Sequence, residues 1–105
     1  ARVRPSKQPS ENLGFEEKVL QVSIPRGGEA GQLEAYRFPF QRVFGPRVTQ
    51  AEVFNTVGRD LILGALDGVN CTIFAYGQTG SGKTFTICGG NGAYEDRGII
   101  PRALA

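Results

Sequence analysis

The sequence predicts an α/β fold, in which helices pack against a β-sheet. Residues 18–24 and 34–40 each alternate apolar and polar side chains, with the period of a half-buried strand. A segment that begins at residue 49 repeats apolar side chains at helical spacing. An uncharged apolar run at residues 70–76 is followed directly by a glycine-rich loop and a second helical segment. Strand and helix signals therefore alternate along the chain.

The composition is that of a globular intracellular protein. Of its 105 residues, 40% are hydrophobic and 21% are charged. The net charge of +2 is small and its basic residues are scattered, so we expect no nucleic-acid partner. No apolar run is long enough for a membrane span, and no signal peptide is visible. Cys71 and Cys88 have no second pair nearby, which predicts free thiols. The lack of methionine indicates a piece of a longer chain.

The first 40 residues predict a short strand and a hairpin. Residues 1–4 are expected to form a strand that ends at Pro5, and the polar stretch 6–17 reads as a connection. The two alternating segments then form a hairpin around a turn at 25–32. Pro39 lacks an N–H group, so it makes the second strand an edge strand or ends it.

A helix is predicted from Thr49 to just before Gly68. Thr49 and Glu52 have the spacing of a capping box, and Gly68 is placed as a C-terminal capping glycine. Gly58 and Gly64 each cost about 1 kcal/mol relative to alanine, so the helix is expected to be irregular. One apolar stripe, expected to pack on a sheet, consists of Val53, Phe54, Val57, Leu61, Ile62 and Ala65.

The remaining elements surround the glycine loop. The run 70–76 is predicted to be a strand covered on both faces, and a helix is predicted to start at Lys83. Residues 89–98 are too rich in glycine to continue that helix, and residues 99–105 are expected to resume it with Pro101 in the first turn.

The loop itself carries a phosphate-binding pattern. Gly77, Gly82, Lys83 and Thr84 satisfy G-x-x-x-x-G-K-[ST], with Gly80 between them. Glycines permit positive φ angles and remove the Cβ atoms that would keep a phosphate away from the backbone N–H groups. The predicted ligand is therefore a nucleoside triphosphate.

Each polar group of the loop has an expected role. The amides of residues 78–84 are predicted to cradle the phosphates, while Lys83 neutralises the β and γ oxygens. The Thr84 hydroxyl is expected to ligate Mg²⁺. For the carboxylates Asp60, Asp67 and Asp96, a solvated surface role is favoured over catalysis.

The sequence around the loop resembles that of kinesin motor domains. "YGQTGSGKTFT" after "NCTIFA" is similar to the kinesin phosphate loop, with its Gly-Gln-Thr start. Four further segments agree in order and spacing: "RVRP" at 2–5, "YRFPFQRVF" at 36–44, the helix "TQAEVFNTVGRDLILGALDGVN" at 49–70 and "GIIPRAL" at 98–104. Residues 1–105 are thus identified as a partial kinesin motor domain, its N-terminal third.

The resemblance implies a fold and an activity. The fold would be that of a P-loop NTPase, a central mixed sheet flanked by helices, here incomplete. The full-length chain would be an ATPase that couples hydrolysis of ATP, with Mg²⁺, to movement along microtubules. The implied catalytic residues are Lys83 and Thr84. Tubulin would bind through parts mostly absent here, the location would be cytoplasmic and cytoskeletal, and the fragment alone would be inactive.

The resemblance also implies which residues contact the two faces of the adenine base. Phe85 would stack on one face of the adenine, with Arg2, Arg4 and Pro5 on the other. Core packing for Phe85 and a solvated strand end for the two arginines remain alternatives. The implied ATP-binding set is Gly77, Gln78, Thr79, Gly80, Ser81, Gly82, Lys83, Thr84, Phe85, Arg2, Arg4 and Pro5.

Two other functions stay open on the sequence. One is a kinesin relative that binds nucleotide or microtubules without hydrolysis, because the motifs that sense the γ-phosphate lie beyond this chain. The other is a different P-loop enzyme that transfers phosphoryl groups to a small acceptor.

Overall fold

A computed structural model describes residues 1–8, 10–25 and 32–104 of the chain. The chain divides into two compact units, Ala1–Arg47 (unit 1) and Val48–Ala105 (unit 2). The architecture of each unit is described by itself.

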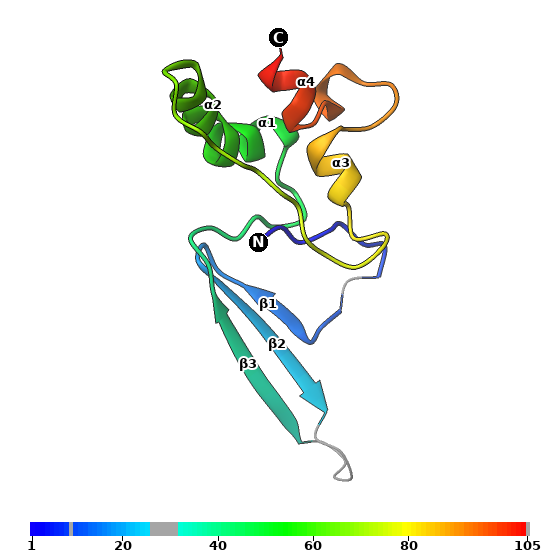
Figure 1. The fold of residues 1–105 in the computed structure, drawn as a ribbon. Helices are drawn as coiled ribbons and strands as arrows, with labels where there is room; N and C mark the ends of the chain where they lie inside the picture. The colour runs from blue at the N-terminus through cyan, green and yellow to red at the C-terminus, as the bar shows by residue number, and fades with distance from the viewer. Residues whose placement is uncertain (9, 26–31, 105) are drawn as a thin grey trace. The chain divides into compact units, whose positions relative to one another are not determined.

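Unit 1 contains a three-stranded antiparallel sheet. Its strands are β1 (Leu13–Phe15), β2 (Val19–Pro25) and β3 (Leu33–Pro39), in the order β1-β2-β3 (Figure 1). The predicted hairpin of β2 and β3 is confirmed, and Pro39 is the last residue of an edge strand. Of the predicted turn at 25–32, residues 26–31 lie outside the described part of the chain.

Strand β1 was not predicted, because it lies inside the stretch interpreted as a connection. It has three residues, too few to show an alternating pattern, and one of them is Gly14. The strand exists because β2 offers it a ladder partner, with Phe15 opposite Leu20 and Leu13 opposite Val22. Its existence therefore depends on a contact between separate parts of the sequence.

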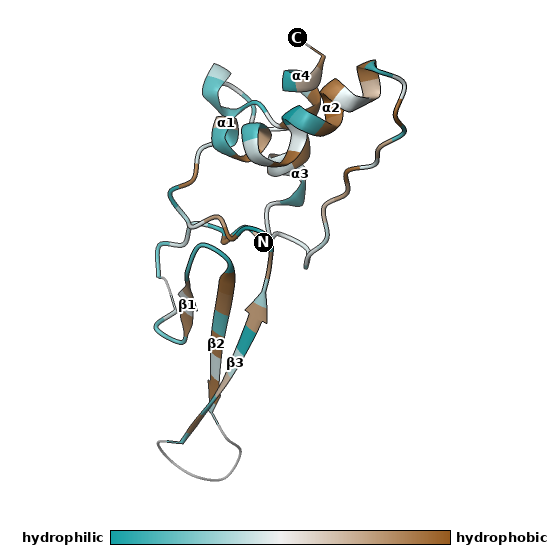
Figure 2. Ribbon diagram, turned by 90° about the vertical axis from the view of Figure 1, so that its left-hand side faces the viewer, coloured by the Kyte–Doolittle hydropathy of each residue, from teal (hydrophilic) through white to brown (hydrophobic). Residues whose placement is uncertain are grey.

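One face of the sheet is mostly apolar, and the other carries polar and apolar residues together. Residues directly opposite in an antiparallel pair share a face, and Leu20 is paired with Phe38 while Gln21 is paired with Arg37. Figure 2 shows hydrophobic and hydrophilic residues alternating along β2 and β3. The side chains of the mostly apolar face are Leu13, Phe15, Leu20, Val22, Ile24, Tyr36 and Phe38, together with Glu34 opposite Ile24.

The predicted strand at residues 1–4 is reduced to one bridge. Arg2 pairs in parallel with Phe44, the Val3 N–H donates to the Phe44 carbonyl at 2.8 Å, and the Phe44 N–H donates to the Ala1 carbonyl at 2.7 Å. Val43 and Phe44 are buried. The N-terminal residues are thus held beside the segment that follows β3.

Unit 2 opens with the predicted helix and its capping box. The Thr49 hydroxyl accepts the Glu52 N–H at 3.2 Å, and the Glu52 carboxylate accepts the Thr49 N–H at 2.8 Å. The helix is α1 (Gln50–Val53), a π-helical turn η1 (Phe54–Gly58) and α2 (Arg59–Leu66). Gly68 follows with φ +89°, the left-handed conformation of a C-terminal cap, as predicted.

The irregularity predicted for this helix is the π turn that ends at Gly58. A Cβ atom at Gly58 would lie 3.2 Å from the Phe54 ring and 3.7 Å from the Ile99 side chain. The tight neighbour is thus Phe54 within the same π turn, whereas the distance to Ile99 is that of an ordinary van der Waals contact. Within unit 2 the η1 part of the apolar stripe contacts the helix that contains Ile99, while Val57 and Leu61 are exposed. Packing of the stripe on a sheet stays a prediction.

Three short helices complete unit 2. They are α3 (Lys83–Ile87), the 3-10 turn η2 (Tyr94–Asp96) and α4 (Ile99–Ala103). The predicted start of α3, the break after it and the resumption with Pro101 in the first turn are confirmed.

The segment 89–98 is a loop whose two ends lie side by side. Gly89 has φ +101° and forms an antiparallel bridge with Arg97. The Gly90 N–H donates to the Asp96 carbonyl at 3.1 Å, and the Gly98 N–H donates to the Cys88 carbonyl at 3.3 Å. The break in the helix is thus closed by backbone hydrogen bonds at its base.

The strand predicted at residues 70–76 is wrong for this structure. The run has no strand, and Phe74 and Tyr76 are 82% and 96% exposed. A strand exists only where a neighbour completes its hydrogen-bond ladder, and no described residue of unit 2 forms a strand beside it. The sheet that is described is antiparallel, so the mixed central sheet remains an expectation. Cys71 and Cys88 are free thiols, as predicted.

Candidate functional site

The glycine loop reverses direction through two left-handed residues. Gly80 has φ +79° and Gly82 has φ +106°, conformations that cost an L-residue about 1–2 kcal/mol. Between them the Ser81 N–H donates to the Gln78 carbonyl at 3.0 Å. The glycines predicted from the motif are therefore required by the backbone. The Ser81 amide, which was predicted to face phosphate, already donates inside the loop.

The loop is compact at its base. A Cβ atom on Gly77 would lie 2.6 Å from the Ser81 hydroxyl oxygen, so only glycine fits there without a shift of that side chain. The Lys83 ammonium, which is partly buried, donates to the Gly77 carbonyl. The structure thus brings Gly77, Ser81 and Lys83 together, with the cation lying across the loop.

Helix α3 begins at the lysine and fixes the residues that follow. The Thr86 N–H donates to the Gly82 carbonyl at 3.0 Å, and the Cys88 N–H donates to the Thr84 carbonyl at 2.7 Å. Thr84, the predicted metal ligand, is exposed, so its hydroxyl is accessible from solvent. Lys83 and Thr84 are therefore carried as neighbours at the start of a single rigid turn.

Phe85 and a buried glutamine meet behind the loop. Phe85 is 38% exposed, and its ring would lie 3.4 Å from a Cβ on Gly90. Its carbonyl accepts a hydrogen bond from the Gln50 side chain at 2.7 Å. Gln50 was not among the predicted site residues, although it shares the helical stripe with Val53 and Phe54. A polar residue on an apolar stripe was the signal available.

The residues of the loop fit a polyphosphate with its metal. Such a ligand needs a backbone that can approach it closely and a cation nearby. The loop provides positive φ angles at Gly80 and Gly82, a Gly77 that lies against the Ser81 side chain, and the Lys83 ammonium across the loop. The described residues contain no group of three His, Cys, Asp or Glu side chains suited to a metal.

Comparison with known proteins decides the family. The model of the kinesin motor domain family matches residues 2–105. The chain belongs to the kinesin motor domain family. It is similar to the kinesin heavy chain of Strongylocentrotus purpuratus, with 41% identity over 105 residues that cover 98% of this chain and 10% of that protein.

Two further kinesins are similar to this chain. The kinesin-like protein KIN-14G of Arabidopsis thaliana is 44% identical over 112 residues, covering 99% of this chain and 11% of its own length. The mouse kinesin-like protein KIF27 is 54% identical over 70 residues, 64% of this chain and 5% of its own length. This kinesin segment therefore spans about a tenth or less of the relatives it matches.

The predicted adenine contacts of this kinesin segment lie in both units. Arg2, Arg4 and Pro5 belong to unit 1, and Phe85 belongs to unit 2. Partial burial lowers the pKa of the Arg2 guanidinium from its ordinary value. The shared contact with adenine stays a prediction.

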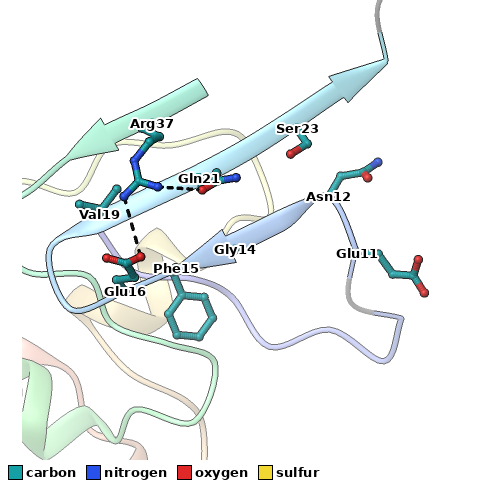
Figure 3. Close-up of a pocket in the computed structure, with 9 residues that line it drawn as sticks. All are labelled: Glu11, Asn12, Gly14, Phe15, Glu16, Val19, Gln21, Ser23 and Arg37. Carbon is teal, nitrogen blue, oxygen red and sulfur yellow. Dashed lines mark hydrogen bonds and ion pairs between the residues drawn. The ribbon is translucent and has the colours of Figure 1, made fainter. Parts of the chain in front are cut away.

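A shallow cavity in unit 1 has the wrong charge for phosphate. It has a volume of about 240 Å³ and lies on the polar side of the sheet (Figure 3). Arg37 donates to Gln21 at 3.1 Å and pairs with Glu16 at 3.8 Å, so its charge is already matched. Glu11 also lines the cavity. Two carboxylates against one arginine disfavour a polyphosphate there.

Within the described residues, none of the helices is long and apolar enough to cross a membrane.

Proposed function

We propose that this chain is the ATP-binding part of a kinesin-type microtubule motor, and that the complete protein couples ATP hydrolysis to movement along microtubules. The observation that carries the proposal is the loop in which the Lys83 ammonium lies across a turn built on left-handed Gly80 and Gly82. Membership of the kinesin motor domain family supports the same function.

Each residue of the loop has a task in this proposal. Lys83 exchanges its hydrogen bond with the Gly77 carbonyl for bonds to the β and γ oxygens of ATP. The Thr84 hydroxyl ligates Mg²⁺, which bridges those oxygens and offsets their charge. The loop amides, apart from that of Ser81, complete the cradle. The ammonium thereby exchanges an uncharged carbonyl acceptor for anionic phosphate oxygens, so phosphate binding is favoured at the lysine.

The adenine end of the pocket is proposed from side chains of suitable shape. Phe85 presents a partly exposed ring for stacking on one face of the base, and Arg2, Arg4 and Pro5 supply the other face. The chain would form part of the mixed central sheet of a P-loop NTPase, in which residues 70–76 would gain ladder partners that no described residue of unit 2 provides. The partner would be tubulin, and the location the microtubule cytoskeleton of the cytoplasm.

The metal-dependent part of binding tests this assignment. In the complete protein, Thr84→Ala is expected to raise the Kd for ATP about tenfold in the presence of Mg²⁺, since one metal ligand is lost. With the metal chelated, the Kd of the variant and of the unsubstituted protein should agree. Thr56→Ala, at an exposed threonine of η1, is the matched control. A difference that persists without Mg²⁺ would show that Thr84 does not act through the metal.

A further inference from the structure

One buried side chain in unit 2 makes two long-range hydrogen bonds. Gln50, the first residue of α1, is 5% exposed. Its side-chain nitrogen donates to the Phe85 carbonyl at 2.7 Å and to the Asp96 carbonyl at 3.1 Å. Both acceptors are backbone groups, and neither belongs to its own helix.

The first acceptor lies at the end of α3, where a helix cannot satisfy its own carbonyl groups. In a regular helix the N–H of residue 89 would serve the carbonyl of residue 85. Here Cys88 and Gly89 both donate to the Thr84 carbonyl, at 2.7 and 3.2 Å. The Gly89 N–H thus donates to Thr84 instead of Phe85, and the Gln50 amide donates to the Phe85 carbonyl.

The second acceptor, the Asp96 carbonyl, lies near the C-terminal end of the segment 89–98. The Asp96 carbonyl also accepts the Gly90 N–H at 3.1 Å, so the Gln50 bond is added to the backbone closure at the base of that segment. One amide nitrogen thus joins α1, the end of α3 and the segment that follows it. Because Gln50 is held by the N-terminal turn of a capped helix, its position is defined.

We infer that Gln50 is a positioning residue of the nucleotide site, acting through the backbone of α3. Helix α3 has five residues and carries Lys83 and Thr84 at its start, so a shift at Phe85 is transmitted to both. A displacement of 1 Å in a positioned group can lower the rate of an enzyme reaction by up to about 100-fold. The inference rests on the proposed function, because it concerns the same phosphate loop.

The test substitutes Gln50 in the complete protein. Gln50→Met keeps the length of the side chain and removes the donor, and Gln50→Asn keeps the amide but shortens its reach by one methylene. We expect Gln50→Met to raise the Kd for MgATP about tenfold, and Gln50→Asn to raise it less. We also expect faster hydrogen exchange at Cys88, Gly89 and Gly90, with α2 (Arg59–Leu66) unchanged. Gln41→Met makes the same chemical change at an exposed position and should alter neither quantity.

The outcomes separate this inference from the proposed function. An unchanged Kd for MgATP in both variants would overturn the inference, whatever happens to hydrogen exchange. Faster exchange in α2 as well would show a general loss of stability instead of local positioning, and would also overturn it. If the unsubstituted protein does not bind MgATP, the proposed function fails and the role of Gln50 in nucleotide binding fails with it.

Discussion

Lys83→Ala is expected to abolish ATP-dependent microtubule gliding by the complete protein and to weaken ATP binding about 100-fold. The ammonium is the group that the structure places across the glycine loop, where it donates to the Gly77 carbonyl. A hydrogen bond between charged groups contributes about 1.5–3 kcal/mol, which corresponds to a 10- to 150-fold change in Kd. Gliding velocity and the Kd from an ATP titration are the measurements.

The control for this substitution is Lys7→Ala, at an exposed lysine of unit 1. It removes the same charge and should leave both quantities unchanged. Stability should change little in either variant, since the bond that Lys83 loses is a single contact with a carbonyl. Normal gliding by Lys83→Ala would contradict the role assigned to the lysine.

Gly89→Ala is expected to have the largest effect on stability, at least about 3 kcal/mol. Its Cβ atom would lie 2.5 Å from the Asp96 carbonyl oxygen and 2.6 Å from the Gly98 nitrogen, which are backbone atoms that cannot rotate away. The residue also has φ +101°, a conformation that disfavours any L-residue. Strain and overlap therefore add together. The midpoint of thermal unfolding of the domain containing this segment is the measurement.

Gly92→Ala is the matched control in the same segment. A Cβ atom at Gly92 meets nothing within 4 Å, so the midpoint should stay close to that of the unsubstituted protein. Equal effects of the two substitutions would show that the close backbone approach at Gly89 is not what restricts this position to glycine.

Features with local causes could be predicted from the sequence. The capping box needs only Thr49 and Glu52, and both of its hydrogen bonds are present. Gly68 ends its helix in the left-handed conformation, and the β2–β3 hairpin follows from alternating side chains. The positive φ angles in the glycine loop were likewise predicted, because the spacing of glycines in the motif reflects the backbone angles that the loop adopts.

Features that depend on distant contacts could not be predicted in the same way. Strand β1 exists through its pairing with β2, and the run 70–76 is no strand because no described residue of its unit pairs with it. The role of Gln50 depends on the carbonyls of Phe85 and Asp96, which lie 35 and 46 positions away. A single helical pattern contains no information about such partners.

The rate of ATP hydrolysis by the complete protein, with and without microtubules, tests the central claim most directly. A kinesin-type motor predicts that microtubules raise the rate severalfold and that Lys83→Ala removes the increase. ATP binding without hydrolysis would instead indicate a non-hydrolysing relative. Hydrolysis or phosphoryl transfer at a rate that microtubules do not change would contradict the account.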